Sequence, residues 1–317
     1  MNFETAVSFR LRRSYKRAIL MMKRTMRDIQ RIQLETLIDI RNVCEKHDLT
    51  YAHYCGTLLG CIRHGGFIPW DDDIDIVMPL RDFRRFRKIF PCEPGMAEKY
   101  VLDCLDTDLY ASNTWIKINR RGTFYAEKSL EGVRYDLGIS VDIYPLIGAP
   151  ESTRLKAAQS LLLKAAAVFC DSEYRRGVGF VPADDKQRRI GEKVDRLPRG
   201  VRTVLAKVIR AVCFADPDRY RHCGTVDGAP FAGKYLRADW NSFTERDFEG
   251  EVFAIPAAYD RFLTTMYGDY MTLPPEWARR PHHRGEVAVR IPQELLDRAP
   301  KLASAGCTGS PETEAGV

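Results

Sequence analysis

The chain has 317 residues, of which 45% are apolar and 29% charged, and its formal net charge is +6. This composition is ordinary for a soluble protein with a full hydrophobic core, arranged as one large domain or two smaller ones. No run of about eighteen apolar residues and no secretory signal are visible, so we expect a cytoplasmic protein. The nine cysteines are odd in number and irregularly spaced, which excludes a disulfide framework and favours reduced thiols.

Positive charge is concentrated near the start of the chain. Residues 9–33 hold nine Lys or Arg against a single acid, Asp28. A helix with this pattern can rest on an anionic membrane surface or bind a phosphate-rich partner, or it can pack as a solvated helix on its own domain. A second basic zone, residues 175–210, has no ladder of aromatic residues, so we do not expect nucleic-acid binding.

The predicted elements of the first half alternate between helices and strands. A helix is predicted over residues 28–47 and a short strand over 50–55, which Gly56 and Thr57 interrupt before the next helix. The elements that follow are a helix at 58–64, an acidic strand at 73–78, a helix at 81–90, and strands at 115–119 and 139–144.

The second half is predicted to be mostly helical at first. Residues 152–214 carry apolar runs that are too short to span a bilayer. Further on, Ser242 to Glu245 resembles a helix-capping box, 252–255 a strand, and 256–267 a helix closed by Gly268. A tail rich in Gly, Ser, Ala and Glu ends the chain, and we expect it to be disordered.

The most informative stretch is Gly66–Pro79, in which four aspartates within five residues lead into an apolar segment. Period-two alternation places Asp73 and Asp75 on the face opposite the isoleucines, and Asp142 faces outward on a later strand. Two like charges about 4 Å apart repel by roughly 4 kcal/mol at an effective dielectric of about 20, so we expect a divalent cation here. An EF-hand loop is excluded because Ile76 stands where that loop needs glycine.

Gly56 and Thr57 add a candidate phosphate site. Glycine lets a phosphate approach the backbone closely, and a helix that starts after Thr57 would aim its free N–H groups and positive dipole end at that phosphate. Asp73, Asp75 and Asp142 would hold one or two Mg²⁺ ions, or Mn²⁺, and so polarise phosphorus toward an attacking hydroxyl. Each part alone has a simpler explanation as a turn, an exposed acidic loop or a strand-end residue; the combination carries the prediction.

Five segments of the sequence resemble the signature blocks of the LicD family, whose relatives include fukutin-related proteins. They are Gly56–Gly60, Arg63–Ile76, Val141–Leu146, Phe248–Gly250 and Tyr267–Pro274, and Ile255–Pro256 also resembles part of the family's C-terminal block. The resemblance covers roughly residues 28–145 and 235–285. Tyr144 departs from the pattern, because the family commonly has Phe there.

The resemblance implies an α/β (α+β) fold, a nucleotidyltransferase-like mixed sheet with flanking helices and a helical insert. It also divides the chain into five expected segments. These are a basic leader (1–27), a nucleotidyltransferase-like catalytic core (28–150), a mostly helical insert (151–234), the C-terminal part of the LicD-like domain (235–298) and a disordered tail (299–317).

The implied reaction is Mg²⁺-dependent transfer of phosphocholine or a polyol phosphate. The donor would be CDP-linked, such as CDP-choline, and the acceptor a hydroxyl of a glycan or lipid-linked glycan in cell-surface polysaccharide modification. Arg63 and Lys117 are candidates for further phosphate contacts beside Gly56 and Thr57. The basic leader would bring the protein to the inner face of the membrane.

Two other functions remain open at this point. A true nucleotidyltransferase would use the same carboxylates but transfer the nucleotide and release pyrophosphate. A non-catalytic module that binds phosphorylated glycans or anionic membrane through its basic surfaces would tolerate the substitutions Asp73→Asn and Asp75→Asn.

Overall fold

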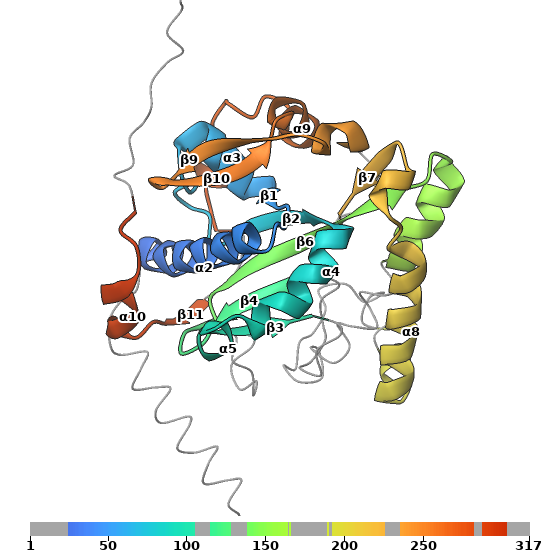
Figure 1. Ribbon diagram of the computed structural model, residues 1–317, viewed down its shortest axis with the longest axis horizontal. Coiled ribbons are helices and arrows are strands. Elements are labelled where there is room, and N and C mark those ends of the chain that lie inside the picture. The colour runs from blue at the N-terminus through green and yellow to red at the C-terminus, as the bar shows by residue number, and fades with distance from the viewer. Residues whose placement is uncertain are drawn as a thin grey trace, which may run out of the picture.

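The computed structural model describes residues 25–104, 115–127, 138–163, 165, 189, 192–225, 235–281 and 287–302. In these residues a mixed sheet is flanked by helices (Figure 1), so the predicted α/β class is confirmed. Most of the expected basic leader and of the expected tail, residues 1–24 and 303–317, lies outside the described part.

A mixed sheet of seven strands forms the centre of the fold. Its main path has the order β1-β2-β6-β4-β3, in which only β2 and β6 run parallel. β7 pairs with the end of β6 and with β8. The strands are β1 (Ala52–His53), β2 (Asp75–Pro79), β3 (Tyr100–Asp103), β4 (Ile116–Arg120), β6 (Ser140–Ala149), β7 (His222–Gly224) and β8 (Tyr235–Leu236).

Two separate antiparallel pairs complete the strands, and only the second of them is a hairpin. β5 (Phe124–Glu127) pairs with β11 (Val287–Arg290), and β9 (Phe243–Phe248) pairs with β10 (Glu251–Pro256). The capping box predicted at residues 242–245 is therefore wrong, whereas the strand predicted at 252–255 is confirmed. The chain reverses at Glu249 and Gly250, with φ values of 59° and 83°, and two positive φ angles in a two-residue turn favour a tight hairpin.

Seven helices and four short 3₁₀ turns are described with their bounds. α2 packs against β6 and β4, α4 against β2 and β6, and α3 against β2 and α9. The helices are α2 (Met26–Lys46), α3 (Cys55–His64), α4 (Leu80–Ile89), α5 (Met96–Lys99), α8 (Arg199–Cys213), α9 (Tyr259–Tyr267) and α10 (Gln293–Arg298). The 3₁₀ turns are η1 (Phe90–Cys92), η3 (Pro217–Arg219), η4 (Arg237–Trp240) and η5 (Glu276–Ala278).

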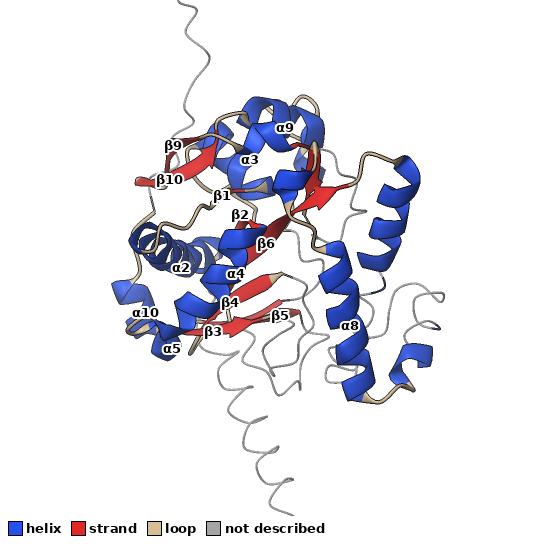
Figure 2. Cartoon of the chain, turned by 45° about the vertical axis from the view of Figure 1, so that its right-hand side comes forward, coloured by secondary structure: helices blue, strands red, loops and turns tan. Residues whose placement is uncertain are grey.

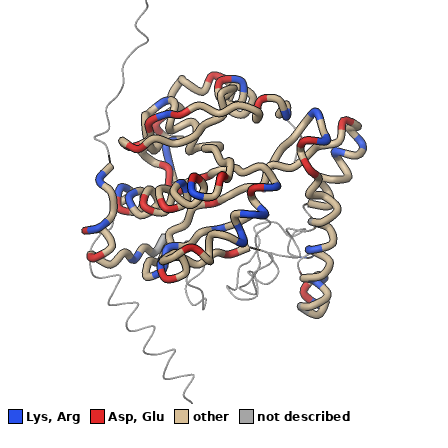
Figure 3. The backbone as a smooth tube through the Cα atoms, in the orientation of Figure 1, with Lys and Arg blue, Asp and Glu red and all other residues tan. Residues whose placement is uncertain are grey.

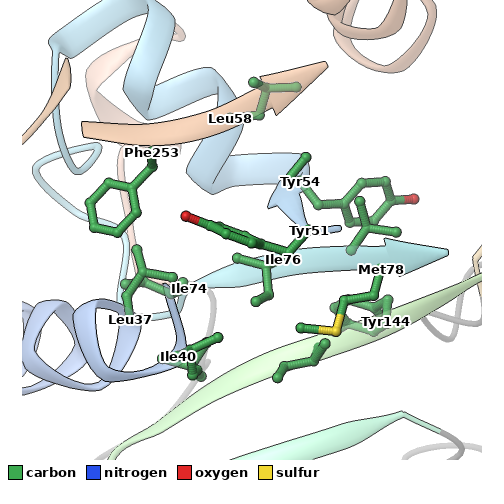
Figure 4. Packing of buried hydrophobic residues seen from close by; sticks show 14 of the residues in the cluster. Leu37, Ile40, Tyr51, Tyr54, Leu58, Ile74, Ile76, Met78, Tyr144 and Phe253 are labelled. Carbon is green, nitrogen blue, oxygen red and sulfur yellow. The ribbon is translucent and has the colours of Figure 1, made fainter. Parts of the chain in front are cut away.

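The apolar residues of the acidic segment enter the main core. Ile74, Ile76 and Met78 are fully buried, as the alternation predicts. They pack with Leu37 of α2 and Phe253 of β10 in one cluster (Figure 4). The core therefore fixes the segment by its apolar side chains and leaves its aspartates on the other side.

Two element boundaries differ from the sequence prediction. β2 begins at Asp75 and not at residue 73, so Asp73 belongs to the loop before the strand. α3 begins at Cys55 and not at Leu58, because the amide of Leu58 already donates to the carbonyl of Tyr54 (3.1 Å) and closes the first turn there. Gly56 and Thr57 consequently lie within the first turn of α3 and do not precede it.

Replacement of Gly60 by alanine tests the packing of α3. A Cβ atom at Gly60 would lie 2.5 Å from the carbonyl oxygen of Gly66 and 3.1 Å from the amide nitrogen of Ile68. Because both neighbours are backbone atoms, we expect Gly60→Ala to lower the free energy of unfolding by about 1–3 kcal/mol. Denaturant titration of the purified protein measures the change.

Gly200 provides the matched control, since it is a helical glycine in α8 with no atom within 4 Å of an added Cβ. We expect Gly200→Ala to be neutral or stabilising by up to about 1 kcal/mol. Equal effects of the two substitutions would contradict the proposed contact between α3 and the loop that follows it.

Candidate active site

Four charged side chains form a row across the central sheet. Asp75 of β2 is in register with Asp142 of β6, Asp142 with Lys117 of β4, and Lys117 with Asp103 of β3. Residues in direct register point to the same face of a sheet. These four side chains are therefore neighbours across the strands, in the spatial order Asp75, Asp142, Lys117, Asp103. The structure therefore brings together Asp75, Asp142 and Lys117, three of the residues singled out from the sequence.

Lys117 neutralises part of this row. Its Nζ lies 2.8 Å from Oδ1 of Asp142, and Trp115 donates from Nε1 to the other oxygen of that carboxylate (3.1 Å). Burial alone would lower the pKa of Lys117, but the contact with Asp142 and the charges of Asp73 and Asp75 raise it. The lysine is therefore a permanent positive charge inside the row.

The loop before β2 supplies a second group of carboxylates. Oxygens of Asp71, Asp72 and Asp73 all lie within 4.8 Å of one another. The carboxyl of Asp72 is buried and accepts a hydrogen bond from the hydroxyl of Tyr125. Asp71 and Asp72 are thus part of the site, although the sequence prediction of metal ligands had chosen Asp73, Asp75 and Asp142.

The carboxylates perturb one another strongly. Burial raises the pKa of Asp71 to about 8, and the nearby charge of Asp73 and a hydrogen bond with its carboxyl raise it further. Burial likewise raises the pKa of Asp75 well above its usual value, with Asp73 and Asp142 adding to the shift and Lys117 opposing it. The cluster therefore carries more negative charge than its own lysine can balance.

Asp103 is a member of the row that the sequence analysis missed. Burial raises the pKa of Asp103 to about 7, while Lys117 beside it acts in the opposite direction. In β3 the buried Leu102 is followed by Asp103, whose side chain points to the opposite face of the sheet. This alternation is the only signal in the sequence that Asp103 lies on the face of the charged row. Its register with Lys117 depends on strand pairing and could not be read from the chain.

The donor set suits a hard divalent cation. Carboxylate oxygens are the ligands that Mg²⁺ and Mn²⁺ prefer, and neither a thiol nor an imidazole belongs to the cluster of Asp71, Asp72 and Asp73. A cation would offset the mutual repulsion that raises the pKa values of Asp71 and Asp75. The oxygens of Asp71, Asp72 and Asp73, which lie within 4.8 Å of one another, therefore fit such an ion.

Two buried glutamines of α2 hold the acidic loop by its backbone. Gln30 donates from Nε2 to the carbonyl oxygen of Asp71 (2.9 Å), and Gln33, three residues later on the same helix, donates from Nε2 to that of Asp72 (2.8 Å). Both side chains are almost completely inaccessible to solvent. The loop has no ladder of its own, so these amides satisfy carbonyl groups that would otherwise be buried without a partner.

Both ends of the loop are held as well. At its start, Oε1 of Glu249 accepts from the amide of Phe67 (3.1 Å) and from Nη1 of Arg27 (3.0 Å). The same carboxyl comes so close to Gly66 that a Cβ atom there would lie 2.5 Å from it. At its end, the hydroxyl of Thr57 accepts from the amide of Asp75 (2.8 Å). The aspartates are thus positioned from α2, α3 and the β9–β10 turn.

The two residues predicted to contact phosphate in α3 also contact the acidic loop. A Cβ atom at Gly56 would lie 2.7 Å from Oδ2 of Asp71, so only glycine allows this carboxylate to approach the helix. Cys55, just before it, has a φ of 44°, an uncommon conformation for a residue with a side chain. The first turn of α3 therefore lies directly against the carboxylates.

Arg63 is placed differently from the other candidates. Its Nη1 donates to the carbonyl oxygen of Tyr270 (2.8 Å) and its Nε to Nε2 of His64 (3.0 Å). Among the described residues these contacts connect α3 to the segment after α9 and not to the aspartates.

Comparison with known proteins agrees with this geometry. Residues 48–149 match the family model described as LicD/FKTN/FKRP, nucleotidyltransferase domain. This region contains α3, the acidic loop, β2 and all of β6. The chain is also 25% identical over 281 residues to the lipopolysaccharide cholinephosphotransferase LicD of Haemophilus influenzae. The aligned residues are 85% of this chain and 100% of that protein. These two comparisons support a LicD family member and a transferase of the LicD type.

Shorter matches exist to two uncharacterized rickettsial proteins. The protein of Rickettsia typhi is 42% identical over 53 residues, which is 17% of each chain. The protein of Rickettsia prowazekii is 40% identical over 53 residues, 17% of this chain and 20% of its own.

The raised pKa of Asp71 predicts how pH affects the metal-free protein. Between the usual carboxyl value of 3.8 and about 8, the folded state keeps a proton that the unfolded state has lost. The free energy of unfolding contributed by this group is therefore fully present below that range, falls as pH rises through it, and levels off above it. We expect Asp71→Asn to show a smaller fall, measured as Tm against pH in the presence of a chelator.

The control for this experiment is Glu98→Gln, which removes an exposed carboxylate on α5. It should leave the dependence of Tm on pH as in the unmodified protein. A wild-type Tm that rises between about pH 4 and pH 8 would contradict the crowding of carboxylates described above.

Substitution of Gln33 tests whether α2 positions the site. Gln33→Met keeps the shape but leaves the buried carbonyl of Asp72 without its donor, so we expect a loss of about 1–3 kcal/mol in the free energy of unfolding. Because the loop that carries the aspartates loses a support, Mg²⁺ or Mn²⁺ affinity measured by titration calorimetry should weaken about tenfold.

Gln159 offers an unusually close control. It is also buried, and its Nε2 donates to the carbonyl oxygens of Gly148 (3.0 Å) and Cys213 (2.9 Å), away from the acidic loop. Gln159→Met should destabilise the protein similarly and leave metal affinity unchanged. If both variants weaken metal binding equally, Gln33 acts through general stability and not through the loop.

Proposed function

We propose that this LicD family member catalyses the divalent-metal-dependent transfer of a phospho-substituent, phosphocholine or a polyol phosphate, from a CDP-linked donor to a hydroxyl of a glycan or glycolipid. The observation that carries the proposal is the meeting of the acidic loop with the row of Asp75 and Asp142 beside the first turn of α3. The site lies inside the region that matches the family's nucleotidyltransferase domain. We further propose a nucleotidyltransferase-like arrangement of this core.

Asp71, Asp73, Asp75 and Asp142 would hold Mg²⁺ or Mn²⁺ in this reaction. The ion supplies charge neutralisation of the donor's diphosphate when it is bound. An ion at Asp142 would share the carboxylate with Lys117 and Trp115, which contact its two oxygens. Asp72 is also bound already, by the hydroxyl of Tyr125. Its role would be to hold the loop in place.

The first turn of α3 would orient the donor. Its N–H groups and the positive end of the helix dipole favour a phosphate, and the missing Cβ of Gly56 leaves the backbone accessible on the side of Asp71. Lys117 would contact a phosphate oxygen from the neighbouring strand. This agrees with its position beside Asp142.

The chemical step is a displacement at phosphorus. The acceptor's hydroxyl oxygen forms a bond to the phosphorus that carries choline or the polyol, and the phosphoanhydride bond breaks to release CMP. The hydroxyl proton passes to a carboxylate of the cluster or to water. The protein's contribution would be positioning and electrostatics, as is usual in phosphoryl transfer.

The proposed acceptor follows from the family comparison. The Haemophilus influenzae relative is named as a lipopolysaccharide cholinephosphotransferase. We therefore propose a lipopolysaccharide or a related lipid-linked glycan as acceptor and CDP-choline as the first donor to examine. Such an acceptor would place the reaction at a membrane, which the basic residues before Thr25 would contact.

Product analysis tests this function. Purified protein with Mg²⁺ is incubated with CDP-choline, CDP-ethanolamine, CDP-glycerol or CDP-ribitol, with a lipopolysaccharide acceptor, and separately with CTP. We expect CMP release and a mass increase of the acceptor with one donor. Asp73→Asn and Asp75→Asn should each lower the rate by at least about a hundredfold, because each removes a charge that the metal needs.

Asp297→Asn, at an exposed position of α10, is the control and should keep full activity. Without metal, the two site variants should melt at the same temperature as the unmodified protein or higher, because repulsion is relieved. Pyrophosphate release from CTP would support a nucleotidyltransferase instead. Unchanged donor turnover by Asp73→Asn and Asp75→Asn would contradict catalysis at these carboxylates.

A further inference from the structure

One face of α8 is an exposed apolar stripe. Its members recur at the spacing i, i+3, i+4, i+7 and i+11, so they lie on one side of the helix. The exposed fractions are high for valine and leucine: Val201 44%, Val204 59%, Leu205 37%, Val208 54% and Val212 69%.

The stripe is not the side by which α8 packs on the protein. Ala206 and Cys213 are buried, and Ile209 packs with Cys213 on a cluster that includes Ile147 and Ala149 of β6. These contacts fix the rotation of α8 about its own axis. The exposed valines are therefore turned away from the packed side by the geometry of the helix itself.

A second helix continues the same exposed surface. Residues 153–163 are helical, and three of their leucines, Leu155, Leu161 and Leu162, are 59%, 68% and 39% exposed. This helix and α8 lie next to each other at one edge of the molecule (Figure 2), joined by the hydrogen bond from Gln159 to the carbonyl of Cys213. Eight of the thirteen large apolar residues that are exposed in the described part of the chain belong to these two helices.

The charge of this edge indicates what covers it. The sequence of α8 contains four Lys or Arg and no Asp or Glu (Figure 3), but Arg202 is buried and lies 3.7 Å from Asp195. Lys207 is exposed and follows Val204 by three positions, so it borders the stripe, and Arg154 is exposed on the neighbouring helix. An anionic lipid surface complements these two exposed cations and takes up the valines of the stripe.

We propose that α8, together with the helix of residues 153–163, docks this face onto an anionic lipid surface and lies in the plane of the headgroups. No helix among the described residues is long and apolar enough to cross a bilayer. An amphipathic helix that lies on the surface needs only one apolar face and flanking cations. The inference does not depend on the proposed reaction, because it rests on residues outside the acidic site.

Vesicle co-sedimentation tests the proposal. The probe is a vesicle of equal parts phosphatidylcholine and phosphatidylglycerol, compared with one of phosphatidylcholine alone, and the full chain is used. We expect binding to the anionic vesicle that weakens with added salt. The double variant Val204→Asp/Val208→Asp should lower the partition coefficient at least about tenfold, since it places two charges on the inserted face.

Val252→Asp is the matched control. Val252 is also an exposed valine (49%), but it lies on β10 and not on α8. We expect it to bind vesicles as the unmodified protein does. Unchanged circular dichroism and unchanged Mg²⁺ affinity of the α8 variant would show that its fold and acidic site are intact.

Two outcomes would overturn the proposal. One is vesicle binding that persists in the α8 variant and is lost on deletion of residues 1–24, which would assign the membrane contact to the basic leader. The other is a dimer in light scattering that the α8 variant converts to a monomer, without vesicle binding by either, which would assign the stripe to a second copy of the chain. Donor turnover in solution is measured in parallel, so that failure of the reaction is distinguished from failure of docking.

Discussion

The repulsion between carboxylates held close together is the constraint on which the site depends. Besides burial, the charge of Asp73 raises the pKa of Asp71. Besides burial, the charges of Asp73, Asp142 and Asp71 raise the pKa of Asp75, and Lys117 opposes only part of this shift. Left to themselves, such charges would separate and remain in water. The surrounding residues must hold them in place at a cost in stability that a cation is suited to offset.

The supports for the loop come from three elements that are far apart in the sequence. α2 supplies two glutamine amides, α3 a threonine hydroxyl, and the β9–β10 turn the carboxyl of Glu249. Each meets the backbone of the loop and leaves the aspartate side chains available. The loop is thus held mainly through its backbone, although Tyr125 also binds the carboxyl of Asp72, and Lys117 and Trp115 bind that of Asp142.

The sequence predicted which residues come together better than it predicted where the helices and strands begin. Alternation in residues 73–78 correctly separated the buried isoleucines from the aspartates, and the Gly-Thr pair was correctly associated with them. Asp103, Gln30 and Gln33 were not predicted as site residues, because their importance depends on strand register and on helix packing across long sequence separations. The strand β9 was mistaken for the start of a helix, since a solvent-facing polar strand has the same residue types as a helix cap.

The contact of Glu249 with the amide of Phe67 joins residues that are 182 positions apart. A ribosome that adds about 5–20 residues per second needs roughly 10–40 s to synthesise that interval. During this time the loop and its aspartates are already outside or leaving the ribosome. Glu249, whose carboxyl binds the amide of Phe67 at the start of the loop, has not yet been synthesised. The acidic loop is therefore completed late in synthesis, and until then its charges can remain apart in water.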